Sequence, residues 1–252
     1  MKYEKILHAR FVSRPNRFIA EVIPEEQTGG RITVHVKTTG RCRELLVPGA
    51  RVILAEARNP KRRTAYDLVA VYKEGTGIVN IDSQAPNKAV HEWLLTQNFS
   101  EVRPEYSLGS SRIDFYMEKN RIPCLMEVKG CTLEIDGVGY FPDAPTERGI
   151  KHLKELSRAA RQGYRCFAAF VIQMEGVDEV RPNTAAHPQF AEALADAEKA
   201  GVTVLCLGCR VTEDEMRIDR VFCPQKEKIE QGGKPDGTGR QGIGENRKTE
   251  KR

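Results

Sequence analysis

The sequence predicts an α/β protein, α+β overall, in which a five-stranded barrel of the oligonucleotide-binding (OB) type precedes a mixed sheet flanked by helices. Three observations predict this order. Five short segments with β-branched, alternating patterns occupy the first 80 residues. Helix-like and apolar strand-like segments alternate after the glycine-rich break at 75–77. The net charge also changes sign between the two parts, and 252 residues give each part enough chain for a core of its own.

The barrel is predicted over residues 1–80 as the first domain. Its segments alternate polar and apolar residues, as Phe18, Ala20 and Val22 do, which places Phe18 in the barrel core. Short strands separated by turn residues are typical of a small closed barrel rather than of βαβ units. The expected strands are Ile6–Phe11, Arg17–Ile23, Arg31–Lys37, Arg51–Ala57 and Tyr66–Tyr72.

Residues 81–224 form the second predicted domain, in which helices and strands alternate. Amphipathic periodicity predicts helices over Asn87–Gln97, 145–163 and Pro188–Ala200, and glycines follow the last two. Short apolar runs between the helices predict a buried mixed sheet. The expected strands are Arg112–Met117, Cys124–Lys129, Cys166–Gln173 and Val202–Leu207.

Residues 225–252 are predicted to be a disordered charged tail, because few apolar side chains stand among the charges and glycines. No apolar run approaches the ~18 residues that cross a bilayer, and the first residues show no secretory signal. We therefore expect a cytoplasmic protein without a membrane partner. Seven scattered cysteines indicate reduced thiols, and the lone CxxC pair Cys206 and Cys209, whose role the sequence leaves open, lacks the further ligands of a zinc site.

Charge is divided unevenly along the chain. Residues 1–80 hold 15 basic and 8 acidic residues, a net charge of +7, whereas residues 81–224 hold 17 and 22, a net charge of −5. A basic module joined to an acidic one is typical of nucleic-acid binding, although solubility alone also produces such asymmetry. We expect DNA as the partner, bound through its phosphates with low sequence specificity. The predicted contacts in the barrel are Arg14, Arg17, Arg41, Arg43, Lys61, Arg62 and Arg63.

Two more phosphate contacts are predicted outside the barrel. Arg148 and His152 lie on the first turns of the helix that begins near residue 145. The backbone amides at the start of a helix favour an anion, so these two side chains are expected to contact phosphate beside them.

Three charged residues of two adjacent predicted strands carry the strongest chemical signal. Asp114 lies on one strand, and Glu127 and Lys129 share one face of the next because side chains alternate. If the strands pair as a hairpin, Asp114 lies beside Glu127. Two close carboxylates repel each other, and a hard divalent cation such as Mg²⁺ or Mn²⁺ relieves that repulsion. With Lys129 orienting or deprotonating a metal-bound water, the pattern favours hydrolysis of a phosphodiester.

An ordinary cross-strand ion pair on a solvated face is the alternative interpretation of Glu127 and Lys129. The apolar neighbours of Glu127 argue against it, because they indicate a central strand far from water. Further candidates are Glu92, as a third metal ligand from the preceding helix, and Gln173, as an accessory phosphate donor. A solvated helix residue and a polar strand end are the alternatives for these two.

A set of short strings resembles one known family, the sugar fermentation stimulation protein family, from about Lys5 to Cys223. Each string alone is weak, but the set is specific. The strings are Asn16-Arg-Phe18, Thr39-Gly-Arg41, Glu44-Leu-Leu46 with Pro48-Gly49, Pro86-Asn87, Ser111-Arg-Ile-Asp-Phe115, Glu127-Val-Lys129, Phe141-Pro-Asp-Ala144, Thr146-Glu-Arg-Gly149 and Lys151-His-Leu153.

The resemblance implies an OB barrel, a second domain of the PD-(D/E)XK restriction-endonuclease type, DNA binding and a role in regulating maltose and other sugar genes. The family's nuclease positions fall on Asp114, Glu127 and Lys129, with Glu92 as the upstream carboxylate. Three departures from the family pattern leave every charged group of this site in place. They are Thr38, where the family usually has Asn, Gly130, where it often has Asn, and Pro145, where it often has Val.

Two functions follow from the sequence. The leading hypothesis is a cytoplasmic DNA-binding protein with a metal-dependent nuclease domain. The rival is a non-catalytic DNA-binding regulator of sugar metabolism that retains the nuclease fold. The sequence leaves open the DNA site and strand preference, the physiological metal, the regulated genes and the oligomeric state, a homodimer included.

Overall fold

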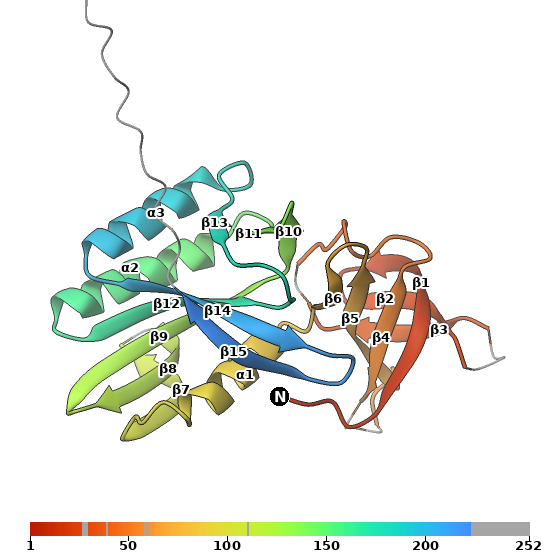
Figure 1. Cartoon of the computed structure of the whole chain (residues 1–252), viewed down its shortest axis with the longest axis horizontal. Coiled ribbons are helices and arrows are strands. Elements are labelled where there is room, and N and C mark those ends of the chain that lie inside the picture. The colour runs from red at the N-terminus through yellow and green to blue at the C-terminus, as the bar shows by residue number, and fades with distance from the viewer. Residues whose placement is uncertain (27–29, 39, 58, 60, 110, 223–252) are drawn as a thin grey trace, which may run out of the picture.

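The computed structural model divides the chain into two parts with different secondary structure (Figure 1). It describes residues 1–222 apart from 27–29, 39, 58, 60 and 110. A barrel of strands comes first, and a sheet flanked by helices follows it. The predicted tail, 225–252, lies outside the described residues. No helix in the described part of the chain has the length and apolarity needed to cross a membrane.

The first part is the predicted five-stranded closed barrel. Its strands are β1 (Ile6–Asn16), β2 (Ile19–Pro24), β3 (Ile32–Val36), β4 (Arg51–Glu56) and β5 (Tyr66–Lys73). They follow the order β3-β2-β1-β4-β5, and a parallel pairing of β3 with β5 closes the circle. Alternation buries side chains such as Phe11, Ala20 and Val22 inside. This arrangement is that of an OB-type barrel.

Two features of the barrel differ from the sequence prediction. A short strand, β6 (Gly77–Asn80), pairs antiparallel with β5 and leads the chain out of the barrel. Four residues are too few for alternation to reveal a strand. The predicted burial of Phe18 is wrong, since the side chain is 48% exposed. The cause is the turn between β1 and β2, where Asn16 Oδ1 accepts from the N–H groups of Phe18 and Ile19 and interrupts the alternation.

The second part is built on a mixed six-stranded sheet. Its strands are β7 (Glu101–Leu108), β8 (Ser111–Lys119), β9 (Ile122–Cys131), β12 (Arg165–Ile172), β14 (Thr203–Val211) and β15 (Met216–Phe222). The order is β15-β14-β12-β9-β8-β7, with β12 parallel to both β9 and β14 and the other pairs antiparallel. β9 is therefore a central strand, as the apolar residues around Glu127 predict.

Helices cover both faces of this sheet. They are α1 (Ala85–Leu94), α2 (Glu147–Arg161) and α3 (Pro188–Lys199). α1 packs on one face against β9 and β15, and α2 lies on the other face against β9 and β12, beside α3 (Figure 1). The hydroxyl of Thr146 accepts from the N–H of Gly149 and caps α2, and Gly163, at φ +95°, follows its end. The predicted helices agree with these within a few residues.

A small sheet and two edge strands are not predicted from the sequence. β10 (Leu133–Ile135), β11 (Val138–Phe141) and β13 (Val180–Pro182) form the small sheet, whose hairpin turns at Asp136 and Gly137. β7 and β15 are the edges of the large sheet. Both carry charged residues, and every side chain except that of Met216 is at least partly accessible. Charged edge strands protect a sheet from pairing with other chains, but they lack the apolar pattern by which strands are predicted.

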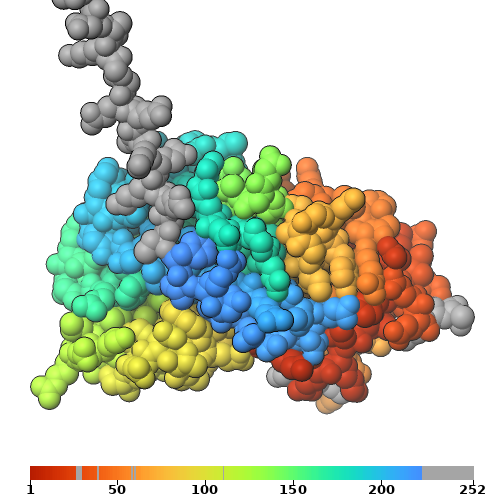
Figure 2. All heavy atoms as spheres, in the orientation of Figure 1, coloured from red at the N-terminus to blue at the C-terminus, as the bar shows by residue number. Residues whose placement is uncertain are grey.

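The two domains are joined by packing as well as by the chain. Figure 2 shows the barrel, in red and orange, packed against the second domain. Met1 is buried in an apolar cluster with Ala85 and Met216 of the second domain, and the N–H of Tyr3 donates to the carbonyl of Asp214 at 2.7 Å. The first three residues thus bridge the barrel and the sheet domain.

Candidate active site

The two candidate carboxylates lie where neighbouring strands separate. The pairing of β8 with β9 ends with Phe115 opposite Met126. Asp114 and Glu127 are the next residue on each strand, so they face each other just beyond the ladder. The N–H of Val128 donates to Asp114 Oδ2 at 2.8 Å. Where the ladder stops, a side chain therefore satisfies the backbone donor and fixes one carboxylate beside the other.

Asp114 is held at both of its oxygens. In addition to the bond from Val128, the side-chain amide of Asn87 on α1 donates to Oδ1 at 2.8 Å. Burial raises the pKa of Asp114, and the negative charge of Glu127 raises it further, against these two hydrogen bonds. Two carboxylates thus share one partly dry site, which is the arrangement that a divalent cation stabilises.

Glu127 uses one oxygen within the protein and leaves the other without a partner. Its side chain is 3% exposed, and Oε1 accepts from Lys129 Nζ at 2.6 Å and from His152 Nδ1. Burial alone would raise the pKa of Glu127, but the hydrogen bond from His152 and the bond and charge of Lys129 outweigh burial and lower it. Oε2 is buried and has no hydrogen-bond partner among the described residues.

His152 lies at this centre rather than on an open phosphate-binding surface. Its side chain is 9% exposed and contacts Glu127, and Nε2 accepts from Arg148 Nε at 3.3 Å. Because Nε2 is an acceptor, Nδ1 carries the proton and donates to the carboxylate. The sequence holds a signal for this placement, since His152 shares the buried face of α2 with Leu153 and Leu156. Arg148 is exposed.

The oxygens of Asp114 and Glu127 suit a hard divalent cation, which takes carboxylate ligands. The buried, unpartnered Oε2 of Glu127 is an atom that such an ion would satisfy. Within the described ranges no three His, Cys, Asp or Glu side chains are grouped to hold one ion, so water and substrate oxygens would complete the shell. The structure does not bring Glu92 here. Its carboxylate, on the exposed side of α1, contacts the amino group of Met1 at 2.6 Å.

A cavity of about 340 Å³ between the two domains is lined by Lys129. The second domain contributes the end of β9, the start of α1 and the loop before α2. The barrel contributes Thr38 and Gly40, which lie after β3. The Lys129 side chain is 17% exposed, and that of Glu127, which it contacts, is 3% exposed.

Two protein-family models match this chain. The model described as "SfsA N-terminal OB domain" matches residues 12–81, and that described as "Sugar fermentation stimulation protein RE domain" matches residues 84–215. This chain belongs to the sugar fermentation stimulation protein (SfsA) family. The family resemblance and the fold class predicted from the sequence are thereby confirmed.

Curated relatives and a solved structure agree with the SfsA assignment. The homolog from Desulfitobacterium hafniense strain DSM 10664 is 49% identical over 219 residues, 86% of this chain and 94% of its own length. The homolog from Clostridium beijerinckii is 46% identical over 222 residues, 86% and 96% of the two chains. The structure of Pyrococcus furiosus SfsA in complex with Ca²⁺ is 25% identical, with a TM-score of 0.78, and the match covers 90% of this chain and 98% of that one.

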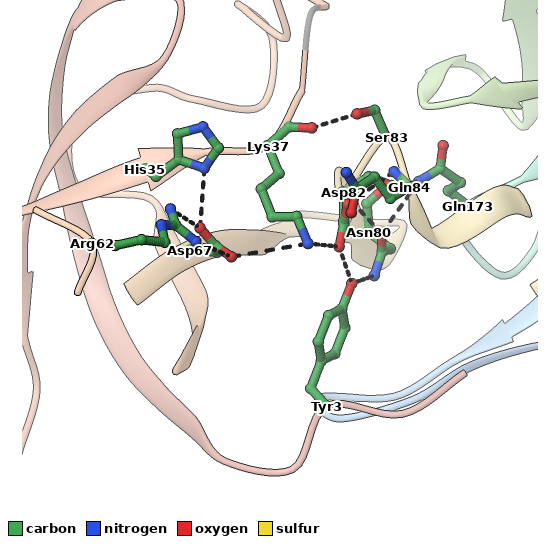
Figure 3. Close-up of polar contacts among 10 residues, drawn as sticks. All are labelled: Tyr3, His35, Lys37, Arg62, Asp67, Asn80, Asp82, Ser83, Gln84 and Gln173. Atoms are coloured by element: carbon green, nitrogen blue, oxygen red, sulfur yellow. Dashed lines mark hydrogen bonds and ion pairs between the residues drawn. The ribbon is translucent and has the colours of Figure 1, made fainter. Parts of the chain in front are cut away.

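In this SfsA chain Gln173 connects the active-site strand to the domain junction. It lines the cavity, but its side-chain amide donates to the carbonyls of Asn80 and Asp82 at 2.9 and 3.3 Å (Figure 3). A Cβ atom at Gly130 would collide with Oε1 of the same side chain. Gly130 therefore makes room for Gln173 beside β9.

The predicted DNA contacts of the SfsA barrel fall into two groups. Arg14 donates to four backbone carbonyls of the neighbouring loops. Arg62 donates to the hydroxyl of Thr64. It also donates to Asp67 at 2.7 Å (Figure 3). These two guanidinium groups hold loops in place. The second group is exposed to solvent and consists of Arg17, Arg41, Arg43, Lys61 and Arg63.

Proposed function

We propose that this SfsA-family protein binds DNA and hydrolyses its phosphodiester bonds with Mg²⁺ or Mn²⁺ as cofactor. The observation that carries the proposal is the pair of carboxylates at the end of the β8–β9 ladder. One of them, Glu127, keeps a buried oxygen without a partner and binds the Lys129 ammonium through the other. Perturbed carboxylates with a lysine beside a cavity are typical of a catalytic site.

Asp114 and Glu127 would hold the cation through their carboxylate oxygens. A bound divalent ion supplies a water of lowered pKa and neutralises charge on the transferring phosphate. The related SfsA from Pyrococcus furiosus was solved in complex with Ca²⁺. Calcium is a hard cation that takes oxygen ligands, as magnesium does, and this relative supports the proposed class of cofactor.

Lys129 and His152 act on the same carboxylate oxygen. His152 fixes the Glu127 side chain, so that Oε2 is directed away from the protein's own donors. Lys129 lines the cavity, and in this proposal its ammonium contacts a phosphate that enters there. There the ammonium stabilises negative charge that develops on the phosphate, or transfers a proton to or from the attacking water.

Cleavage assays with the full chain test this proposal. Supercoiled, linear and single-stranded DNA are incubated with Mg²⁺ or Mn²⁺, and with EDTA as the metal-free control. Lys129→Met keeps the aliphatic stem and removes only the ammonium, so it should still bind Mn²⁺ but lose a factor of about 10² to 10⁴ in rate. Lys199→Met, on the exposed surface of α3, is the matched control and should cleave as the wild type does.

Absence of cleavage of every substrate with both metals would contradict the nuclease proposal. DNA binding without cleavage would instead support the non-catalytic regulator of sugar metabolism. Cleavage by Lys129→Met at the wild-type rate would contradict the role given to this lysine while leaving the activity itself established.

A further inference from the structure

We infer that the proposed active site takes single-stranded DNA, which passes over Phe18 at the rim of the barrel on its way to Lys129. This inference rests on the proposed nuclease function and adds the strand state of its substrate. Two independent observations support it. The proposed catalytic centre is buried beside a cavity that the barrel covers, and an exposed aromatic residue lies on the part of the barrel that covers the cavity.

The catalytic centre is recessed between the domains. The side chains of Glu127 and Lys129 are 3% and 17% exposed, and the cavity beside Lys129 has a volume of about 340 Å³. Pockets of roughly 300–1,000 Å³ hold one small ligand, which is the size range of a single nucleotide. A duplex, whose major groove alone is about 12 Å wide, is too broad to bring a phosphate to Lys129.

The barrel covers this cavity and is held there by contacts with the second domain. Gly40 approaches the loop before α2 so closely that an added Cβ would lie 2.7 Å from Asp143 Oδ2. At the junction, Lys37 Nζ donates to the fully buried Asp82 at 2.8 Å (Figure 3). Lys73 of β5 forms a further ion pair with Glu134 of β10. These two ion pairs hold the barrel against the second domain, so we expect a substrate to enter the cavity without the domains separating.

Phe18 forms an exposed platform in the turn between β1 and β2, on the part of the barrel that covers the cavity. Phe18 is 48% exposed, and the guanidinium of Arg17 lies over one face of its ring, 4.5 Å from the ring centre, which leaves the other face for a base. An exposed aromatic ring with an arginine beside it binds an unpaired base by stacking and its phosphate by charge. In a duplex the bases are already stacked on each other, so such a platform favours single strands.

Arg14 joins the platform to the cavity wall. Its guanidinium donates to the carbonyl of Arg17 at 2.7 Å, and also to the carbonyls of Thr38 and Gly40 at 3.2 and 3.0 Å. Thr38 and Gly40 line the catalytic cavity. The stacking ring and the cavity wall are therefore joined through the hydrogen bonds of Arg14, which also donates to the carbonyl of the exposed Arg41.

Binding in EDTA tests the path without relying on catalysis. Fluorescence anisotropy measures the affinity of the full chain for a labelled 12-nucleotide single strand and for the same sequence as a blunt duplex. Phe18→Ala should weaken single-strand binding roughly tenfold, as expected for the loss of one stacked base, and leave duplex binding unchanged. Ile23→Ala, an equally exposed apolar residue of the barrel, is the matched control and should change neither. If Phe18→Ala loses the same affinity for the duplex as for the single strand, or loses affinity for neither, the proposed single-strand path over Phe18 is wrong.

Cleavage with Mn²⁺ then separates the two proposals. The single strand and the single-stranded tail of a tailed duplex should be cut, and the blunt duplex should resist. Cleavage of blunt duplex as fast as of single strand would overturn this inference and leave the nuclease function intact. Absence of all cleavage would contradict the nuclease function, and the binding comparison would still decide whether the single-strand path exists.

Discussion

The two oxygens of Glu127 have different environments, and this difference underlies the proposed chemistry. Oε1 receives hydrogen bonds from His152 and Lys129, whereas Oε2 is buried with no partner in the described part of the chain. The donors on one oxygen keep the carboxylate ionised in spite of burial, as the lowered pKa of Glu127 shows. An ionised carboxylate with a free oxygen is ready to bind a cation.

His152→Ala should weaken Mn²⁺ binding about 10- to 100-fold, which is the usual effect of removing a partner that orients a metal ligand. The reason is that Glu127 then keeps only Lys129 as its donor and its carboxylate is free to turn. Isothermal titration with Mn²⁺ measures this change. His152→Gln can still donate from an amide and should recover part of the affinity, whereas unchanged affinity in His152→Ala would contradict the positioning role.

Local rules predict part of this site. Side-chain alternation and hairpin pairing suffice to bring Asp114, Glu127 and Lys129 together, because all three lie on adjacent strands. Glu92 is different, since helical periodicity shows only that it is exposed, and its partner, the amino group of Met1, is distant in sequence. The role of Asn87 as a donor to Asp114 likewise depends on how α1 packs on the sheet.

At the scale of elements, the turn between β4 and β5 shows why a basic sequence run is not one uniform binding surface. Arg62 is turned back onto Asp67, which also accepts from His35 (Figure 3). Lys61 and Arg63 on either side are exposed. The sequence does not distinguish these three residues, because charge alone does not show which side chain forms an ion pair within the protein.

Salt dependence distinguishes these neighbours. The double change Lys61→Ala/Arg63→Ala should weaken DNA binding and flatten the plot of log affinity against log salt by about 0.7 per lost contact on single strands. Arg62→Ala should flatten it less, because its guanidinium is engaged with Asp67. Anisotropy titrations between low and moderate salt measure both slopes, and an unchanged slope in the double variant would show that these side chains do not contact phosphate.

The pairing of Asp67 should also make stability depend on pH. Burial alone would raise the pKa of Asp67, but the bonds from Arg62 and His35 outweigh it and lower the pKa below the unfolded value of about 3.9. The stabilisation is therefore present above that value and is lost as the pH falls through the lowered pKa. Asp67→Asn should cost about 1–2 kcal/mol of unfolding free energy at pH 7, and the difference should shrink below pH ~4.

Urea denaturation at several pH values measures this difference. Asp136→Asn is a suitable control, because Asp136 is exposed at a turn with φ +52°, a conformation that asparagine tolerates. This control should change stability little at any pH. A deficit in Asp67→Asn that persists undiminished at low pH would contradict the ionic origin of the effect.

At the scale of the whole molecule, the domain junction is held by buried charge. Asp82 is fully buried between the domains and accepts from Lys37 at 2.8 Å and from Tyr3 at 3.2 Å. Burial raises the pKa of Tyr3, and the charge of Asp82 adds to this effect, so the phenol remains a donor. The sequence predicts two domains and their order, but the contacts between them join residues far apart in the chain and lie beyond local patterns.

Lys37→Met should lower the unfolding free energy by about 3 kcal/mol, because it leaves Asp82 buried without its cation. The double variant Lys37→Met/Asp82→Asn removes both charges and should recover part of the loss. Urea denaturation of the full chain measures both changes. If the double variant is less stable than Lys37→Met by as much as Asp82→Asn alone destabilises the wild type, the two residues act independently.

We propose that Asp114 and Glu127 form a divalent-cation site on which the nuclease chemistry depends. Anomalous diffraction from crystals soaked in Mn²⁺ tests it most directly, because manganese is located independently of any substrate. We predict a peak between the carboxylates, at coordination distance from Glu127 Oε2, that disappears in Asp114→Asn. The absence of a peak at this position at saturating Mn²⁺, or a peak that persists unchanged in the variant, would contradict the proposed cation site.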